Sequence, residues 1–168
     1  MKCLIVVDMQ VDFITGSLGS KDAEAIVPTV VNKVKNFDGK VVFTRDTHLD
    51  DYLQTQEGKK LPINHCIKDT EGWQVCDELK PYANTIVDKV TFGSIDLPSI
   101  IRGFGENIEE IELCGLCTDI CVISNAMILK AAFPETRIVV DQNCCAGVSR
   151  ESHNTALDAM RAVQIEIV

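Results

Sequence analysis

The chain has 168 residues and a formal net charge of -9, and 46% of its residues are hydrophobic. These values fit one globular domain spanning residues 1–168, with a sizeable core. The negative charge argues against nucleic acid or an anionic membrane as a partner, because both are also negative. No apolar run approaches the roughly 18 residues of a membrane span, and no basic segment with an apolar stretch precedes the first strand, so we expect a cytoplasmic protein.

Strand and helix patterns alternate along the chain without a change in composition. Apolar runs of strand length occur at 3–8, 40–44, 85–88, 108–114, 136–140 and 163–168. Helical patterns occur at 22–36, 73–79, 98–104, 118–132 and 149–162. This alternation predicts an α/β protein with a three-layer α/β/α fold, in which helices cover both faces of a mainly parallel six-stranded sheet.

The first and third predicted strands end on charged residues. Asp8 closes the apolar run that begins at Cys3, and Lys89 closes the run that begins at Thr85. The carboxyl ends of parallel strands share one edge of a sheet, and ligands bind there, so these two side chains can converge. A carboxylate beside a thiol can accept its proton, and an ammonium keeps that carboxylate ionised. An isolated charge at a strand end is more often simply solvated. Asp8 and Lys89 therefore indicate a catalytic site only if a thiol lies at the same edge.

That thiol is Cys121, in the predicted first turn of the helix 118–132. Unpaired amides and the positive end of the helix dipole favour the thiolate, which is the form that attacks carbonyl carbons. The alternative is a buried cysteine that packs as a small apolar residue. Because Asp8 and Lys89 are predicted at the same edge, we interpret Cys121 as the candidate nucleophile.

A second group of polar residues follows the strand 40–44. Asp46 and His48 stand two residues apart, so their side chains point the same way if the chain stays extended. His65 comes from a later loop, and Glu57 lies between them in the sequence. Two imidazoles and one or two carboxylates suit zinc, manganese or iron. Capping or hydrogen bonding is the alternative role for the Asp46–His48 pair.

The remaining cysteines and aromatic residues carry weaker signals. All eight cysteines are expected to be reduced thiols. Three aromatic residues adjoin the candidate site segments and could wall a pocket for a flat substrate, with core packing as the alternative: Phe13, Trp73 and Phe92. Cys114 and Cys117 form a C-x-x-C spacing, which leaves a redox role open, and Cys144 and Cys145 are interpreted as packing or rim residues. His153, near the start of the last helix, is interpreted as a surface or cap-adjacent residue.

Four segments, in this order along the chain, resemble the isochorismatase-like cysteine hydrolases and their nicotinamidase-related branch. They are residues 7–13 around Asp8, residues 46–48 with 65–66 and 72–73, residues 88–94 around Lys89, and residues 115–122 around Cys121. The resemblance implies a catalytic triad of Asp8, Lys89 and Cys121 and a metal held by Asp46, His48 and His65. It also implies a further ligand at Glu57 in some members, a cis peptide between Leu116 and Cys117, and an oxyanion hole formed by the amides of Cys117 and Cys121.

The activity implied by this resemblance is hydrolysis of nicotinamide to nicotinate and ammonia through a thioester on Cys121. One divalent metal ion is expected as cofactor, with zinc ahead of manganese or iron, and a homo-oligomer is expected. Cys117 and Ile120 stand where nicotinamidases commonly have Ala and Tyr, so another small amide, an N-carbamoyl compound or a ureide is the alternative substrate. More distant alternatives are a thiol redox protein and a metal-binding module without catalytic activity.

Overall fold

The computed structural model describes residues 1–105 and 107–168, and a six-stranded sheet forms its centre. The strand order is β3-β2-β1-β4-β5-β6, and every neighbouring pair is parallel. The predicted three-layer α/β/α fold is therefore confirmed. The strands are β1 (Lys2–Val7), β2 (Lys40–Asp46), β3 (Ile86–Lys89), β4 (Glu110–Leu116), β5 (Arg137–Ala146) and β6 (Glu166–Ile167).

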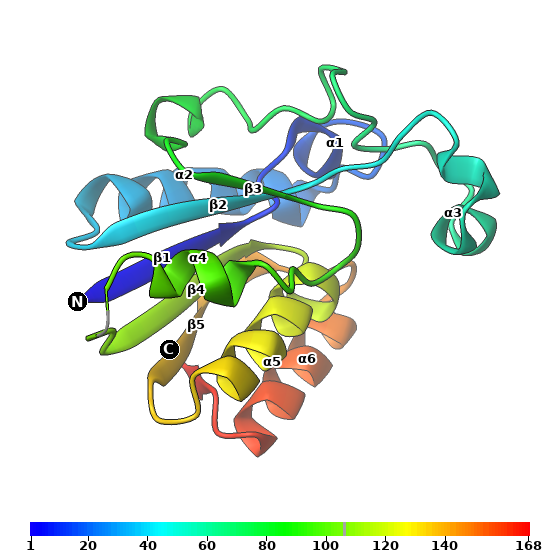
Figure 1. Ribbon diagram of the computed structural model, residues 1–168. Coiled ribbons are helices and arrows are strands. Elements are labelled where there is room, and N and C mark those ends of the chain that lie inside the picture. Colours follow the sequence, from blue (N-terminus) through cyan, green and yellow to red (C-terminus); the bar gives the residue numbers. More distant parts are fainter. Residues whose placement is uncertain (106) are drawn as a thin grey trace.

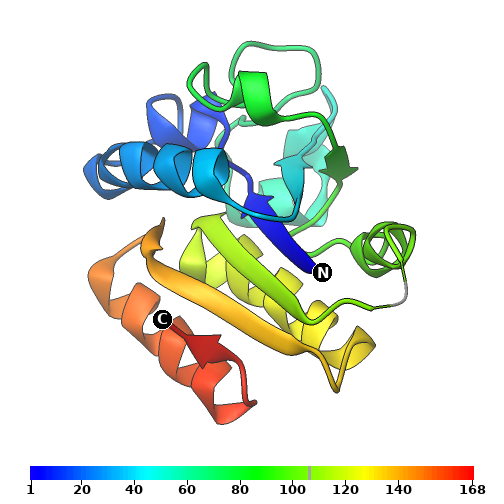
Figure 2. The same ribbon diagram turned by 90° about the vertical axis from the view of Figure 1, so that its left-hand side faces the viewer.

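Helices cover both faces of this sheet (Figures 1 and 2). The helix α2 (Lys21–Asn36) covers one face, and α4 (Leu97–Arg102), α5 (Ile123–Ala132) and α6 (Arg150–Ala162) cover the other. Two short helices, α1 (Val11–Ile14) and α3 (Gln56–Lys60), lie near the carboxyl ends of the strands. None of the helices in the described ranges is long and apolar enough to cross a membrane.

The two central strands are the most deeply buried elements. All seven residues of β4 are buried, and β1 is buried after its first residue, Lys2. Burial on both faces explains why β1 is an almost continuous apolar run. In β4, the buried carboxylates of Glu110 and Glu112 are paired with basic side chains. The chain leaves β1 toward β2 on one side, and β4 lies on the other, which makes the carboxyl ends of β1 and β4 the switch point of the sheet.

The ends of the long helices follow their capping residues. Ser20 precedes α2, and its hydroxyl accepts a hydrogen bond from the amide of Ala23 at 3.1 Å. Ser149 precedes α6 and forms a capping box with Ser152. Each cap satisfies amides that have no partner within the helix, so these two starts could be predicted from sequence.

Two predicted elements are wrong or too long. Residues 73–79 form turns rather than a helix, because this segment pairs with the chain after β1: Val11 donates to the carbonyl of Gln74 at 3.0 Å, and Cys76 donates to Met9 at 2.9 Å. The last strand is shorter than predicted, because Gln164 adopts a left-handed conformation in the turn after α6. Only Glu166 and Ile167 remain to pair with β5.

Candidate active site

The structure brings Asp8, Lys89 and Cys121 together at the switch point of the sheet. The ammonium of Lys89 lies 2.7 Å from Oδ2 of Asp8 and 3.4 Å from Sγ of Cys121. All three side chains are buried. Lysine therefore sits between the carboxylate and the thiol, although the three residues come from three different segments of the chain.

Asp8 is held at the end of β1 by the neighbouring strand. Its φ is 47°, a left-handed conformation that few residues other than glycine adopt, and this turns the side chain at the strand end. The hydroxyl of Thr44 donates to Oδ1 at 2.7 Å. Among the described residues, no donor other than the Lys89 ammonium reaches Oδ2. Burial raises the pKa of Asp8, with Lys89 acting in the opposite direction, so Oδ2 is suited to accept a proton.

Lys89 is charged in this environment. Burial alone would lower its pKa, but the carboxylates of Asp8 and Asp46 raise the pKa above its ordinary value. The ammonium also donates to the carbonyl of Thr91 at 3.1 Å. A fixed positive charge therefore stands beside both the carboxylate and the thiol.

The protonation state of Cys121 differs from the expectation. Burial raises the pKa of this thiol well above its ordinary value, the charge of Asp8 raises it further, and Lys89 only partly opposes them. The start of a helix does not compensate for the loss of water around a buried thiolate. Cys121 is therefore a thiol at rest, and its proton must leave when it attacks.

The turn that carries Cys121 is irregular. The peptide bond between Leu116 and Cys117 is cis, as the resemblance implied, and a π-helical turn (Thr118–Val122) follows before α5 begins. Cys117 lies before the first residue of this turn and Cys121 lies within it, where helix amides lack intrahelical partners. The side chain of Asn125 donates to the carbonyl of Cys121 at 2.8 Å, which anchors the far side of the turn.

Asp46, His48, Glu57 and His65 form a second cluster beside the first. One ligand atom from each lies within 4.8 Å of all the others. His48 Nε2 is 2.9 Å from Asp46 Oδ2 and 3.5 Å from Glu57 Oε1, and His65 Nε2 is 3.6 and 3.7 Å from the same two oxygens. Ligands about 2.0–2.2 Å from a tetrahedral zinc ion stand about 3.3–3.6 Å apart, so the spacing and the donor types fit a divalent metal.

The imidazole of His65 is oriented for such a role. Its Nδ1 lies 2.8 Å from the carbonyl of Ile63, which leaves Nε2 to face the cluster. Metal-binding histidines are commonly held in this way by a backbone carbonyl. The Cys66 amide next to it donates to Oδ2 of Asp12 at 2.7 Å, which ties this loop to α1.

Asp46 belongs to both clusters. Its Oδ1 lies 3.2 Å from the Lys89 ammonium, while Oδ2 faces His48. Burial would raise the pKa of Asp46, but the hydrogen bond with His48, the nearby imidazole of His65 and the charge of Lys89 hold the pKa below its ordinary value. This carboxylate is therefore ionised and can pair with a cation through each of its two oxygens.

A cavity of about 500 Å³ opens onto both clusters. Asp46, Glu57, His65 and Cys121 border it, and so do Phe13 and Phe92, as expected for pocket walls. Further lining residues come from the loop before α2, the turn with the cis peptide, and the loop after β5: Leu18, Cys117, Ile120 and Val148. The size is typical of a pocket for a small organic molecule.

Trp73 lies elsewhere, and we correct its predicted place in the pocket wall. Its indole Nε1 donates to the hydroxyl of Thr47 at 2.8 Å, and the guanidinium of Arg45 lies 3.3 Å from the centre of its ring. These contacts support the chain between Asp46 and His48 from behind. Trp73 thus stabilises the chain at Thr47, beside the second cluster, and does not line the cavity.

Sequence reasoning missed several residues that position the site. The buried side chain of Gln10 donates to the carbonyls of Asp46 and Trp73, each at 2.9 Å, and its Oε1 accepts the Asp46 amide at 2.7 Å. Thr44 and Asn125 fix Asp8 and Cys121 as described above. A polar residue inside an apolar run, such as Thr44, is a signal that could have found them.

Each of the eight cysteines, all within the described ranges, is a free thiol. Burial raises the pKa of Cys114 well above its ordinary value, and the pKa of Cys117 to about 12. Buried thiols of this kind are poor nucleophiles. The C-x-x-C spacing therefore gains no support as a redox centre.

The fold and this site are those of an α/β cysteine hydrolase. The Isochorismatase domain model matches residues 2–168, so the chain belongs to the isochorismatase family. The isochorismatase family protein PncA of Bacillus subtilis (strain 168) is 32% identical over 174 residues, which cover 93% of this chain and 92% of that protein. The nicotinamidase/pyrazinamidase of Mycobacterium tuberculosis is 27% identical over 189 residues, which cover 100% and 98%.

Solved structures agree with this assignment. The crystal structure of the pyrazinamidase of Pyrococcus horikoshii in complex with zinc superposes with a TM-score of 0.86 at 28% identity, covering 99% of this chain and 98% of that one. The chain therefore lies in the nicotinamidase-related branch of the family.

Proposed function

We propose that this protein is a metal-dependent cysteine amidase that converts nicotinamide to nicotinate and ammonia through a thioester on Cys121. The observation that carries this proposal is the position of the Lys89 ammonium, which contacts the base Asp8, the thiol of Cys121 and the carboxylate of Asp46. Amide hydrolysis by the similar nicotinamidases supports the reaction type. The zinc in the similar pyrazinamidase supports zinc as the first candidate metal.

The first half-reaction uses the thiol and its base. Asp8 takes the proton of Cys121 as the sulfur attacks the amide carbonyl, so the buried thiolate never has to exist alone. The amides of Cys117 and Cys121 donate to the oxyanion that forms on the carbonyl oxygen. When the carbon–nitrogen bond breaks, Asp8 returns the proton to the leaving ammonia and the acyl group remains on sulfur.

The second half-reaction consumes water. Asp8, again a carboxylate, removes a proton from a water molecule that attacks the thioester, and the proton passes to the Cys121 sulfur as the acid leaves. Lys89 keeps Asp8 ionised between these steps. The atoms balance as one amide and one water giving one acid and one ammonia.

The second cluster would hold the substrate. Asp46, His48 and His65 would bind a divalent ion, with Glu57 as a further oxygen ligand, and the ion would supply a Lewis acid for a ring nitrogen or a water. Phe13 and Phe92 border the same cavity and can enclose a flat aromatic ring.

The test measures ammonia and acid release from nicotinamide, with an N-carbamoyl amine, a ureide and other small amides assayed in parallel. We expect nicotinamide to be the best substrate and a rapidly quenched reaction to show the acyl mass on Cys121. Turnover of an N-carbamoyl compound or ureide without turnover of nicotinamide would transfer the assignment to that substrate. Release of ammonia from none of them would refute the amidase.

A further inference from the structure

His153, predicted to be a surface or cap-adjacent residue, contacts a residue of the turn that carries the nucleophile. Its Nδ1 lies 2.7 Å from the hydroxyl oxygen of Thr118. Thr118 is completely buried, and among the described residues this is the one hydrogen bond of its hydroxyl. A buried hydroxyl without a partner is costly, so the contact fixes where Thr118 sits.

Thr118 occupies a sensitive place in the chain. It follows Cys117 directly and begins the π-helical turn that contains Cys121, so it lies between the two amides assigned to the oxyanion hole. The next residue, Asp119, accepts the amide of Val148 through Oδ1 at 3.0 Å. Two consecutive residues of the turn are therefore held by the chain at the start of α6.

The packing around this contact leaves little room for another arrangement. A Cβ atom at Gly147 would lie 2.9 Å from Cβ of His153 and 3.0 Å from Oδ1 of Asp119, so only glycine lets α6 approach the turn this closely. His153 lines a separate hollow of about 200 Å³ with Asp22 and Cys145, not the substrate cavity. His153 therefore does not border the substrate cavity, and it reaches the turn through the hydroxyl of Thr118.

We infer that His153 is a positioning residue, which holds the turn through Thr118 so that the amides of Cys117 and Cys121 point at the same carbonyl oxygen. This inference rests on the proposed attack by Cys121, but not on nicotinamide being the substrate. Oxyanion stabilisation depends on donors placed within a few tenths of an ångström, so a small shift of the turn lowers kcat. Substrate binding by the aromatic walls and the second cluster is unaffected, so KM changes little.

The test compares His153→Ala and Thr118→Val with their conservative versions, His153→Asn and Thr118→Ser, and with the double variant. Thr155→Ala is the matched control, because Thr155 lies exposed on the same helix and donates only to the carbonyl of Glu151. We expect each disruptive variant to lose about tenfold in kcat with KM within about twofold, and the double variant to lose no more than either one. The conservative variants recover most of the loss, and the control keeps full turnover.

Two measurements separate positioning from a general structural effect. Alkylation of Cys121 by iodoacetamide needs no oxyanion hole, so its rate should stay within about twofold in every variant. The sulfur of Cys121 adds to the carbonyl carbon of pyridine-3-carboxaldehyde, and the thiol proton passes to the carbonyl oxygen. The amides of Cys117 and Cys121 donate to that oxygen and stabilise the adduct. Its affinity should fall about tenfold in His153→Ala.

Two results would overturn the inference. An unchanged kcat and aldehyde affinity in well-folded His153→Ala would show that the contact does not position the turn. A parallel loss of kcat, alkylation rate and thermal stability would show a purely structural role. Should wild-type protein hydrolyse no amide, the proposed function fails, and the aldehyde affinities still decide whether His153 positions the turn.

Discussion

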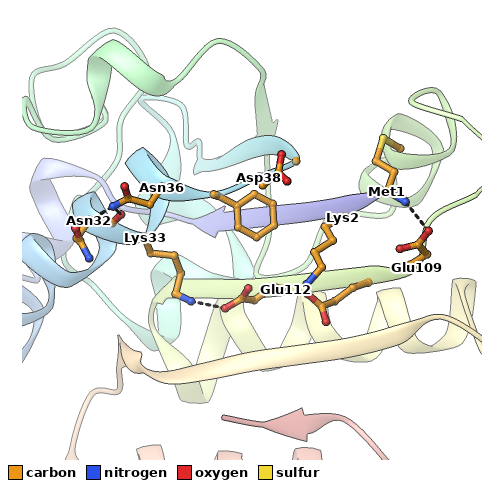
Figure 3. Close-up of a pocket in the computed structure, with 11 residues that line it drawn as sticks. Met1, Lys2, Asn32, Lys33, Asn36, Asp38, Glu109 and Glu112 are labelled. Carbon is orange, nitrogen blue, oxygen red and sulfur yellow. Dashed lines mark hydrogen bonds and ion pairs between the residues drawn. The ribbon is translucent and has the colours of Figure 1, made fainter.

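Two lysines in the described residues each lie between two carboxylates, yet only one of them belongs to a site with the features of an active site. At the carboxyl end, Lys89 lies between Asp8 and Asp46, with its side chain 1% exposed. On the other side, Lys33 lies between Glu112 and Asp141, with its side chain 21% exposed. The hollow that Lys33 and Glu112 border, at the amino ends of β1 and β4, is the larger one at about 730 Å³ (Figure 3).

The difference lies in what remains unsatisfied. The carboxylates around Lys33 are paired, and no cysteine lines that hollow among the described residues (Figure 3). At the other end, Oδ2 of Asp8 has one partner only, and a thiol lies 3.4 Å from the same ammonium. A buried cluster in which every charged atom is paired supports the fold. A buried carboxylate oxygen with one partner, beside a thiol, can also accept a proton during catalysis.

The largest expected effect is that of Cys121→Ala. We expect amide turnover to fall about 10⁴-fold or more, because the nucleophile is removed while the fold is kept. Cys117→Ala is the matched control: its amide remains, so this variant should retain most of the turnover. Ammonia release measures the turnover of both variants. Near-normal turnover by Cys121→Ala would show that Cys121 is not the nucleophile.

Asp8→Asn should lose about 10²–10⁴-fold in turnover, measured as ammonia release, because an amide cannot shuttle the proton.

Lys89→Ala sharpens the comparison further, since it leaves two buried carboxylates without their cation. The pKa of the Cys121 thiol should then rise, and iodoacetamide labelling at neutral pH should slow. Labelling at the wild-type rate in well-folded Lys89→Ala would exclude the electrostatic role of this lysine.

His48→Ala tests the second cluster. We expect the purified protein to contain close to one transition metal per chain, and the variant to lose both the metal and nicotinamide turnover while Cys121 remains open to alkylation. Elemental analysis measures the metal, and His153→Ala should retain it because that histidine lies outside the cluster. Metal-free wild-type protein that hydrolyses another amide after chelation would assign these residues to substrate contact instead.

The smallest effect is expected at the amino end. Lys33→Met should leave turnover unchanged and lower the free energy of unfolding by roughly 1–3 kcal/mol, because the largely buried carboxylates of Glu112 and Asp141 lose their cation. Burial would raise the pKa of Asp141, but Lys33 holds the pKa below its ordinary value. Its contribution is therefore present above an unfolded pKa of about 3.9 and is lost as the pH falls through the folded value.

Urea unfolding at pH 7 and at pH 3 checks this last prediction. The difference between wild type and Lys33→Met should be larger at pH 7, because Asp141 becomes protonated as the pH falls. A loss of turnover in Lys33→Met would contradict the distinction drawn between the two ends.

The parts that sequence could predict are those governed by local pattern. A buried apolar run identified β1, the mixed pattern at 108–114 identified β4, and the residues that follow them marked the switch point. Trp73 and the segment 73–79 were misassigned because their burial comes from pairing with residues 9–11, a long-range contact without periodicity. The strength with which burial opposes the thiolate form of Cys121 could not be predicted either, because burial depth cannot be read from neighbouring residues.

The shared carboxylate of Asp46 links two events that are otherwise separate. One of its oxygens faces the Lys89 ammonium and the other faces the histidines. A change of charge at one cluster therefore alters the electrostatic environment of the other. Thermodynamic linkage is reciprocal: the factor by which a bound ion alters the equilibrium constant for modifying Cys121 equals the factor by which that modification alters ion affinity. Titrating metal into alkylated and unmodified protein therefore measures how strongly the two clusters communicate without any turnover.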